Sequence, residues 1–202
     1  MLKILYQSVV STVLLVLIVC GAYPLLITGI GQLVFPSQAT GSLIRDGQGK
    51  VIGSRLIGQA FTKPEYFHGR PSAAGSAPSA PNGYDAANSS GSNLGPTNQK
   101  FADGLKANVD SLLKDNPLLK KGEIPGDLVT ASASGLDPHI SPEGALAQID
   151  RVARARSLSS SQIEELVRKH IEGPDLGFLG ESVVNVLSLN LELNEKYPVK
   201  TQ

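Results

Sequence analysis

The most reactive-looking residues in the sequence gather around Asp137-Pro138-His139, with Ser132 and Ser134 just before them and Ser141 just after. An acid, a base and a hydroxyl are the components of a serine hydrolase. However, the Gly-x-Ser-x-Gly turn that presents many nucleophilic serines does not occur. Pro138 also stiffens the segment, so we expect Asp137 to cap a turn. The residues therefore predict that the chain by itself is not an enzyme.

Metal and nucleotide chemistry find little support in the residue types. The three histidines, His68, His139 and His170, have spacings that match no metal motif, and we expect His170 to be a packed core residue on an apolar helix face. Cys20 is the single cysteine, which excludes a disulfide framework and a cysteine metal site. No Walker sequence occurs. We predict no metal bound by this chain.

The basic run Arg151, Arg154 and Arg156 is expected to form a solvated helix face. A surface for an acidic partner or for phosphates is the alternative. All the acidic residues and all but one of the basic residues lie from Arg45 onward, so the charges of that part nearly cancel. This balance lacks the basic footprint of a nucleic-acid binder.

These residues follow an apolar opening stretch. No charged residue occurs between Lys3 and Arg45, and residues 9–30 are dense in Val, Leu and Ile. A bilayer core about 30 Å thick requires roughly 20 such residues in a helix, so this stretch is long enough for one transmembrane helix. A cleavable signal peptide, with Ser37-Gln38-Ala39 as its cleavage site, is the alternative, but its apolar region spans only about 7–15 residues. Because the span holds no ionisable side chain, it is not itself an ion pathway.

Ser8, Ser11 and Thr12 stand at positions i, i+3 and i+4 of this helix and therefore share one face. Small polar residues on one face favour a neighbouring helix in lipid, so these three are candidate partner-binding residues. Bonding to their own helix is the alternative. We expect Pro24 to end or kink the helix.

Residues 41–61 read as a β-hairpin, with Asp46-Gly47-Gln48-Gly49 as its turn. Residues 61–70 hold the rings of Phe61, Tyr66, Phe67 and His68. We expect this loop of four rings to form a small hydrophobic cluster. Residues 71–98 form a long loop rich in Gly, Ser and Pro, in which Tyr84 and Leu94 are expected to keep the chain ordered.

Three amphipathic helices are predicted after this loop. The first spans about residues 98–114, and residues 128–131 are read as a short strand after it. The second begins at Ser141 as N-cap, has Leu146, Ile149, Val152 and Ala153 as its buried stripe, and places Gln148, Arg151 and Arg154 largely on other faces.

The third predicted helix begins with a capping box, Ser161-x-x-Glu164. For residues 183–193 a strand that turns into a helix is favoured, although alternating leucines also suit a strand. The predicted fold class is α+β: a transmembrane anchor and exit linker over residues 1–38, then one mixed soluble domain over residues 39–202.

Several long blocks of the sequence resemble one family, the C subunit of the bacterial Kdp potassium-transporting ATPase. The resemblance covers nearly the whole chain, and Ser182-Val183 is its only noted departure. The blocks are Phe61-x-x-Pro64-x-Tyr66-Phe67-x-x-Arg70-Pro71-Ser72, Ser90-Gly91-Ser92-Asn93-Leu94-Gly95-Pro96-x-Asn98, Val129-Thr130-Ala131-Ser132-Ala133-Ser134-Gly135-Leu136-Asp137-Pro138-His139-Ile140-Ser141-Pro142, Gln148-x-x-Arg151-Val152-Ala153-x-Ala155-Arg156, and Leu179-Gly180-Glu181 with Val184-Asn185-Val186-Leu187.

The resemblance implies a non-catalytic accessory subunit of a high-affinity, ATP-driven potassium uptake pump. Its implied partners are an ATP-hydrolysing pump subunit, a potassium-channel-like subunit and a small membrane subunit. The family is described as a catalytic chaperone that raises the ATP affinity of the pump subunit, and Gln148 matches the family's candidate nucleotide contact. A membrane-anchored cell-envelope hydrolase and an envelope binding module are the alternatives.

The resemblance also implies a single-pass protein of the bacterial inner membrane. Direct contact with ATP requires a cytoplasmic domain, whereas one anchor followed by a large domain suits an outward-facing one. Charge does not decide the side, since long domains translocate largely regardless of charge. We expect the domain on the periplasmic side, with any effect on ATP transmitted between pump states.

Overall fold

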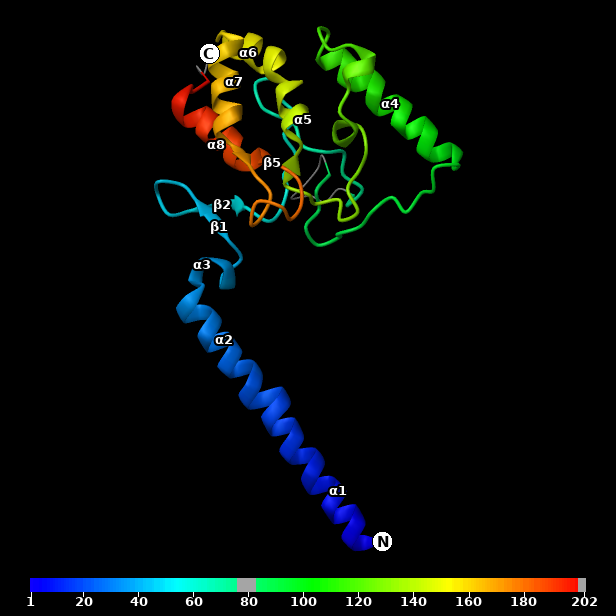
Figure 1. Ribbon diagram of the computed structural model, residues 1–202, viewed down its shortest axis with the longest axis vertical. Helices are drawn as coiled ribbons and strands as arrows, with labels where there is room; N and C mark the ends of the chain where they lie inside the picture. Colours follow the sequence, from blue (N-terminus) through cyan, green and yellow to red (C-terminus); the bar gives the residue numbers. More distant parts are fainter. Residues whose placement is uncertain (76–82, 200–202) are drawn as a thin grey trace. The chain divides into compact units, whose positions relative to one another are not determined.

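The computed structural model describes residues 1–75 and 83–199 (Figure 1). Its chain contacts separate two compact units, Met1–Ser54 and Arg55–Gln202. This division groups the hairpin with the anchor, whereas the sequence placed the start of the soluble domain at residue 39.

A continuous helical run, Leu2–Val34, forms most of the first unit and is long and apolar enough to span a membrane. It consists of α1 (Leu2–Leu15), a π-helical segment η1 (Val16–Ala22) and α2 (Tyr23–Val34). The helix continues through Pro24, so of the two expected effects of this proline, an end or a kink, the end is wrong. A proline ring clashes with the carbonyl four residues earlier in an α-helix, and the wider π turn directly before Pro24 relieves that crowding.

The short helix α3 (Pro36–Ala39) and a hairpin complete the first unit. The strands β1 (Leu43–Arg45) and β2 (Val51–Ser54) pair antiparallel. Asp46 Oδ1 accepts from the backbone N–H groups of Gln48 and Lys50, both at 2.9 Å. The predicted hairpin and its turn are therefore confirmed.

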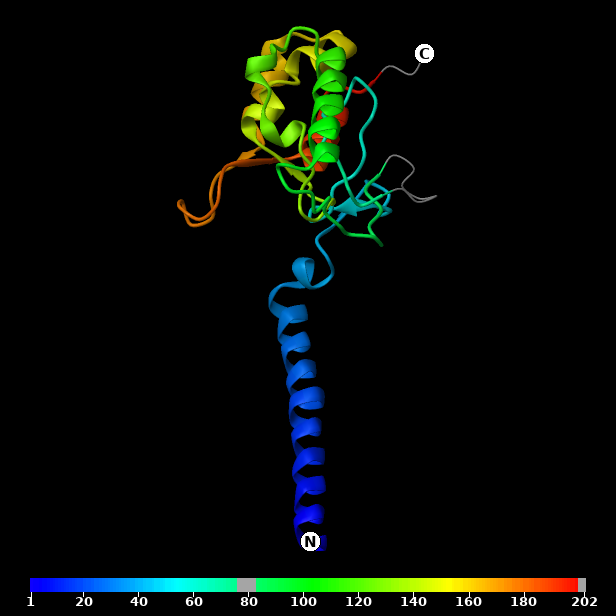
Figure 2. The same ribbon diagram turned by 90° about the vertical axis from the view of Figure 1, so that its right-hand side faces the viewer.

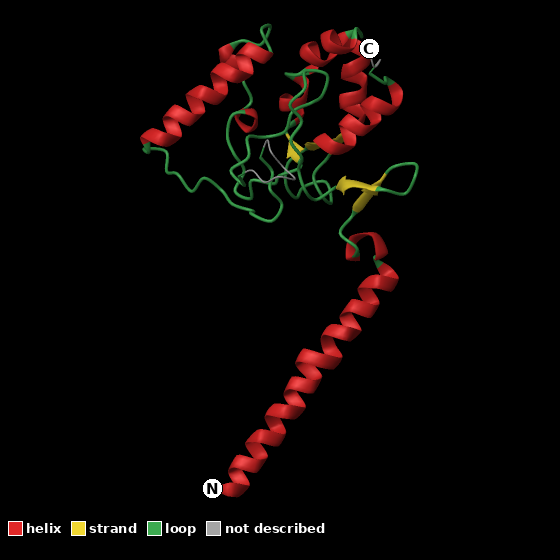
Figure 3. Cartoon of the chain, turned by 180° about the vertical axis from the view of Figure 1, so that it is seen from behind, coloured by secondary structure: helices red, strands yellow, loops and turns green. Residues whose placement is uncertain are grey.

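In the second unit, residues 55–75 and 83–98 run without a helix or strand, as Figure 3 shows. The predicted loop is held in place from several sides: the Tyr84 hydroxyl donates to the Arg70 carbonyl at 2.6 Å, and the Ser72 hydroxyl donates to the Gly135 carbonyl at 2.6 Å. Gly135 has φ of 67°, and a Cβ there would lie 2.5 Å from the Ser90 carbonyl oxygen, so only glycine fits. The predicted anchoring by Tyr84 is thus confirmed for the described part of the loop, and residues 76–82 lie outside it.

Helix α4 (Gln99–Asp115) follows, with the Asn98 side chain as its N-cap, which confirms the first predicted helix. None of its residues is fully buried, so its apolar stripe is only half-covered. Two 3₁₀ turns come next, η2 (Lys121–Glu123) and η3 (Gly126–Leu128). The strand predicted over residues 128–131 is wrong, because the Thr130 amide and hydroxyl both donate to the Gly126 carbonyl, at 3.0 and 2.7 Å, and close a turn.

The remaining helices begin at well-defined caps. Ser141 caps α5 (Pro142–Leu146) as predicted, but a turn at residues 147–148 separates it from α6 (Ile149–Arg156). Helix α7 (Ser160–Lys169) uses Ser159 and Gln162 as its capping box. The predicted box at Ser161 and Glu164 is wrong, because the helix has already begun at Ser160.

A small antiparallel sheet lies beside these helices. Its strand order is β3 (His139–Ile140), β5 (Val183–Asn185), β4 (Ile171–Glu172). Strand β5 runs directly into α8 (Val186–Lys196), whose N-cap Asn185 accepts from the Ser188 amide at 3.0 Å. The predicted strand that turns into a helix is confirmed, and the alternating leucines belong to the helix.

The core lies between α6, α7, α8 and this sheet. Apolar side chains from all of them are fully buried, and Phe67 reaches the same cluster from the loop of four rings. The buried members with no exposed surface are Phe67, Ala145, Val152, Ile163, Val167, Val184, Leu189 and Leu193. The α+β fold class with an N-terminal apolar helix is therefore confirmed.

Candidate functional site

Three of the sequence-predicted site residues, Gln148, Arg151 and Arg154, come from the turn before α6 and from α6 itself. The structure gives them different environments. Gln148 and Arg151 are buried, with 1% and 6% of their surfaces exposed, while Arg154 is exposed. The expectation that all three lie on faces away from the buried stripe of this helix is therefore wrong for Gln148 and Arg151.

Arg151 makes the densest set of polar contacts in the described part of the domain. Its Nη1 donates to the carbonyl oxygens of Pro64 at 2.7 Å and Tyr66 at 2.8 Å. Its Nη2 donates to Gln148 Oε1 at 2.6 Å, and its Nε donates to Asn116 Oδ1 at 3.1 Å. One guanidinium thus joins the loop of four rings, the end of α4 and the start of α6.

The positive charge of Arg151 is stabilised by the dipoles of carbonyl and amide groups, and no carboxylate in the described part of the chain forms an ion pair with it. Burial lowers the pKa of Arg151 to about 10, and the more distant Asp115 opposes this shift. The group stays protonated at neutral pH. A guanidinium suits this position because its planar fork of donors reaches several carbonyl oxygens at fixed angles.

Gln148 completes the network. Its Nε2 donates to the carbonyl oxygens of His68 and Gly144, both at 3.1 Å. Its Oε1 accepts from the His68 amide at 2.8 Å as well as from Arg151. The amide side chain therefore uses both donors and both acceptor positions inside the protein, and a nucleotide would have to displace one of these partners to bind it.

His68 is the titratable neighbour of this network. Its Nε2 lies 3.0 Å from the Lys63 carbonyl oxygen and 3.3 Å from Arg151 Nη1. Burial, and next the charge of Arg151, lower the pKa of His68. The neutral imidazole is consequently favoured, and its Nε2 can donate to the Lys63 carbonyl oxygen.

A second arginine of α6 holds the same short segment of this loop, between the two carbonyl groups that Arg151 binds. Arg156 donates to the carbonyl oxygens of Glu65 at 2.7 Å and Tyr197 at 2.6 Å. Its guanidinium carbon also lies 5.1 Å from the centre of the Tyr66 ring, within the range of a cation–π contact. The sequence did not separate Arg156 from its neighbours, because a spacing of five residues turns its side chain roughly 140° away from that of Arg151 and gives no shared-face signal.

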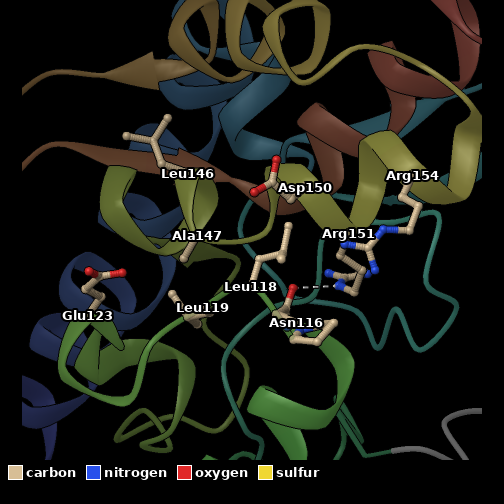
Figure 4. Close-up of a pocket in the computed structure, with 10 residues that line it drawn as sticks. Asn116, Leu118, Leu119, Glu123, Leu146, Ala147, Asp150, Arg151 and Arg154 are labelled. Carbon is tan, nitrogen blue, oxygen red and sulfur yellow. Dashed lines mark hydrogen bonds between the residues drawn. The ribbon is translucent and has the colours of Figure 1, made fainter.

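Arg154 points to a small cleft, shown in Figure 4. The cleft has a volume of about 160 Å³, and its lining combines both charges with apolar side chains: Asn116, Pro117, Leu118, Leu119, Glu123, Leu146, Ala147, Asp150, Arg151 and Arg154. Sites for small organic ligands usually have about 300–1,000 Å³. The cleft is therefore better suited to receive a side chain of a partner than a nucleotide.

The cluster around Asp137 does not form a hydrolase site in the described structure. Asp137 accepts from the His139 amide at 3.0 Å and from Arg70 Nη1 at 3.1 Å, so the predicted turn cap is confirmed. His139 Nε2 lies 3.3 Å from the side-chain nitrogen Nδ2 of Asn185. The Ser132 and Ser134 hydroxyls lie 3.3 Å from each other and accept from nearby backbone amides.

Other candidates fall in other places. The His170 side chain is packed, with 14% of its surface exposed, but its Nε2 lies 3.1 Å from Glu192 Oε2, so the predicted apolar surroundings are wrong. Ser8, Ser11 and Thr12 lie exposed on α1, and their role stays a prediction. Within residues 1–75 and 83–199, no group of three or more His, Cys, Asp or Glu side chains could hold a metal ion.

Comparison with known proteins gives one consistent result. The family model described as "K+-transporting ATPase, c chain" matches residues 5–195. A "Potassium-transporting ATPase KdpC subunit" from Nitratidesulfovibrio vulgaris is 53% identical over 96% of this chain and 95% of its own length. Proteins of the same name from Koribacter versatilis and Caulobacter vibrioides are 51% and 50% identical, over 100% and 98% of this chain and 99% and 96% of their own lengths.

The two arginines of the site predict different effects on stability. Arg151→Leu leaves the carbonyl oxygens of Pro64 and Tyr66 without donors, and each buried unsatisfied group costs about 1–3 kcal/mol. We expect the variant to lose about 3–5 kcal/mol, within the summed cost of the two carbonyl groups that lose their donor. The matched variant Arg154→Leu should stay within about 0.5 kcal/mol of the parent, because its side chain is exposed. Denaturant unfolding of the full chain in detergent, followed by circular dichroism, measures both, and equal losses would contradict the assignment.

Proposed function

The chain belongs to the family of the c chain of K⁺-transporting ATPases and is an accessory subunit of a potassium pump, and we propose that it stabilises the pump complex and raises the ATP affinity of the ATP-hydrolysing subunit. The observation that carries this proposal is the match of the family over nearly the whole chain. The proposal extends to a high-affinity pump for potassium uptake in the bacterial inner membrane.

The proposed partners are the ATP-hydrolysing subunit, a potassium-channel-like subunit and a small membrane subunit. Two surfaces of this chain support a role in binding them. The face of Ser8, Ser11 and Thr12 allows a second transmembrane helix to approach closely. Arg154, exposed beside its cleft, offers a charged contact to an acidic side chain.

The proposal assigns no reaction to this chain. Its support is the geometry of the most reactive cluster, in which His139 faces Asn185 and the serine hydroxyls face backbone amides. A nucleophile and its general base need hydrogen-bond contact, directly or through one water. In the described part of the chain His139 Nδ1 lies 3.8 Å from Asp137 Oδ1, but no hydrogen bond joins His139 to a serine hydroxyl, so the hydrolase alternative lacks its contact between nucleophile and base.

We place the soluble domain on the periplasmic side, so that its effect on ATP is a coupling between distant sites. Such coupling requires that the domain contact two states of the pump with different affinities. The four hydrogen bonds of the Gln148 side chain support this route over direct contact. If Gln148 did contact a nucleotide, the network around Arg151 would first have to open.

The effect on ATP is measured with the purified pump complex, with and without this chain. We expect loss of the chain to raise the KM for ATP by about 5–150-fold, the usual range of allosteric coupling. The isolated full chain in detergent should show no saturable ATP binding. An unchanged KM would contradict the chaperone role. ATP binding by the isolated chain that is lost in Gln148→Ala would contradict the coupling route.

The side of the membrane is tested by cysteine labelling in intact cells. We use Cys20→Ala as background and place one cysteine at the exposed helix position Ala107. A membrane-impermeant maleimide should label Ala107→Cys without permeabilisation. The control Leu2→Cys, at the other end of the span, should be labelled only after permeabilisation. The reverse pattern would defeat the periplasmic placement.

A further inference from the structure

The connection between β4 and β5 carries an apolar tip, residues 174–180, which the proposed function does not use. Leu176 is 82% exposed, Phe178 is 74% exposed and Leu179 is 51% exposed. Figure 2 shows this connection, in orange, extending away from the helices of its unit. Single exposed apolar residues are ordinary, but three large ones within four positions form the kind of patch that marks an interaction site.

The apolar tip has a defined backbone. Asp175 and Leu179 exchange two hydrogen bonds, each of 2.9 Å, which close the loop at its base. The Gly177 amide donates to the Pro174 carbonyl at 3.0 Å within it. Leu176 has φ of 53°, a left-handed conformation that is unfavourable for a leucine. Since the side chain gains no burial within the chain, this conformation points to a requirement outside it.

The charges around the apolar tip are of one sign. Asp175 and Glu181 are exposed at its two ends, and residues 173–181 contain no Lys or Arg. The acidic residue just before them, Glu172, is paired with Arg55 at 2.9 Å. Segments that settle on lipid surfaces carry Lys and Arg beside their apolar groups, because membrane surfaces are negatively charged. An apolar tip with an acidic border therefore fits a protein surface better than lipid.

We propose that the apolar tip docks into an apolar pocket bordered by Lys or Arg on another subunit of the potassium-pump complex. This inference rests on the proposed function, which supplies the complex. Phe178 and Leu176 are the anchors, since a few large side chains in desolvated pockets carry most of an interface's affinity. Asp175 and Glu181 meet the basic border and set the orientation of docking.

Photocrosslinking in the assembled complex tests the contact. A benzophenone amino acid replaces Phe178 in the full chain, and a second variant carries it at Val199, an apolar position that is 45% exposed elsewhere in the domain. We expect a crosslink from position 178 to a different protein subunit, with a yield at least about tenfold above that from position 199. Crosslinks to lipid, to a second copy of this chain, or to nothing would each overturn the proposal.

Substitutions test the chemistry of the contact. Leu176→Ser with Phe178→Ser should weaken binding of the chain to the other subunits by at least about tenfold. Its thermal unfolding should match the parent because both side chains are exposed. Asp175→Lys with Glu181→Lys should also weaken binding, and less so at high salt. Binding equal to the parent in both variants would overturn the proposal. If even the parent chain fails to co-purify with pump subunits, the proposed function itself fails.

Discussion

The buried guanidinium of Arg151 is the contact on which the described domain depends. It donates to two carbonyl oxygens of the loop of four rings and to side chains from two helical segments. These segments are far apart in the sequence, and the loop carries no helix or strand of its own. A buried cation without partners is very costly, so the loop must keep its carbonyl oxygens in place for the domain to fold.

Side-chain clamps take the place of a large sheet in this domain. The Asn190 side chain accepts from the Phe67 amide and donates to the Phe67 carbonyl, both at 2.9 Å. The Gln148 side chain binds the amide and the carbonyl of the next residue, His68, at 2.8 and 3.1 Å. These polar groups are all used for internal contacts. What remains for recognition are exposed features: Arg154, the half-covered helix α4 and the apolar tip. This separation agrees with a subunit that works by contact with neighbours.

The sequence predicted the elements whose signals are local. Apolar length identified the span, Ser141 identified the start of α5, and the turn at Asp46 identified the hairpin. The burial of Arg151 could not be predicted, because its carbonyl partners lie more than 80 residues away and carry no sequence signature. The N-cap of α7 was predicted at Ser161 but lies at Ser159, because several neighbouring serines in this run are equally suitable as caps. The apolar tip lacked any periodic pattern that could have drawn attention to it.

Hydrogen exchange of the full chain in detergent tests the central claim most directly. The amides of Phe67 and His68 donate to buried side chains at 2.9 and 2.8 Å, in a segment without regular secondary structure. If the arginine network holds this loop, both amides should exchange as slowly as those in the middle of α7. Exchange as fast as that of the exposed hairpin turn at residues 47–49 would contradict the account.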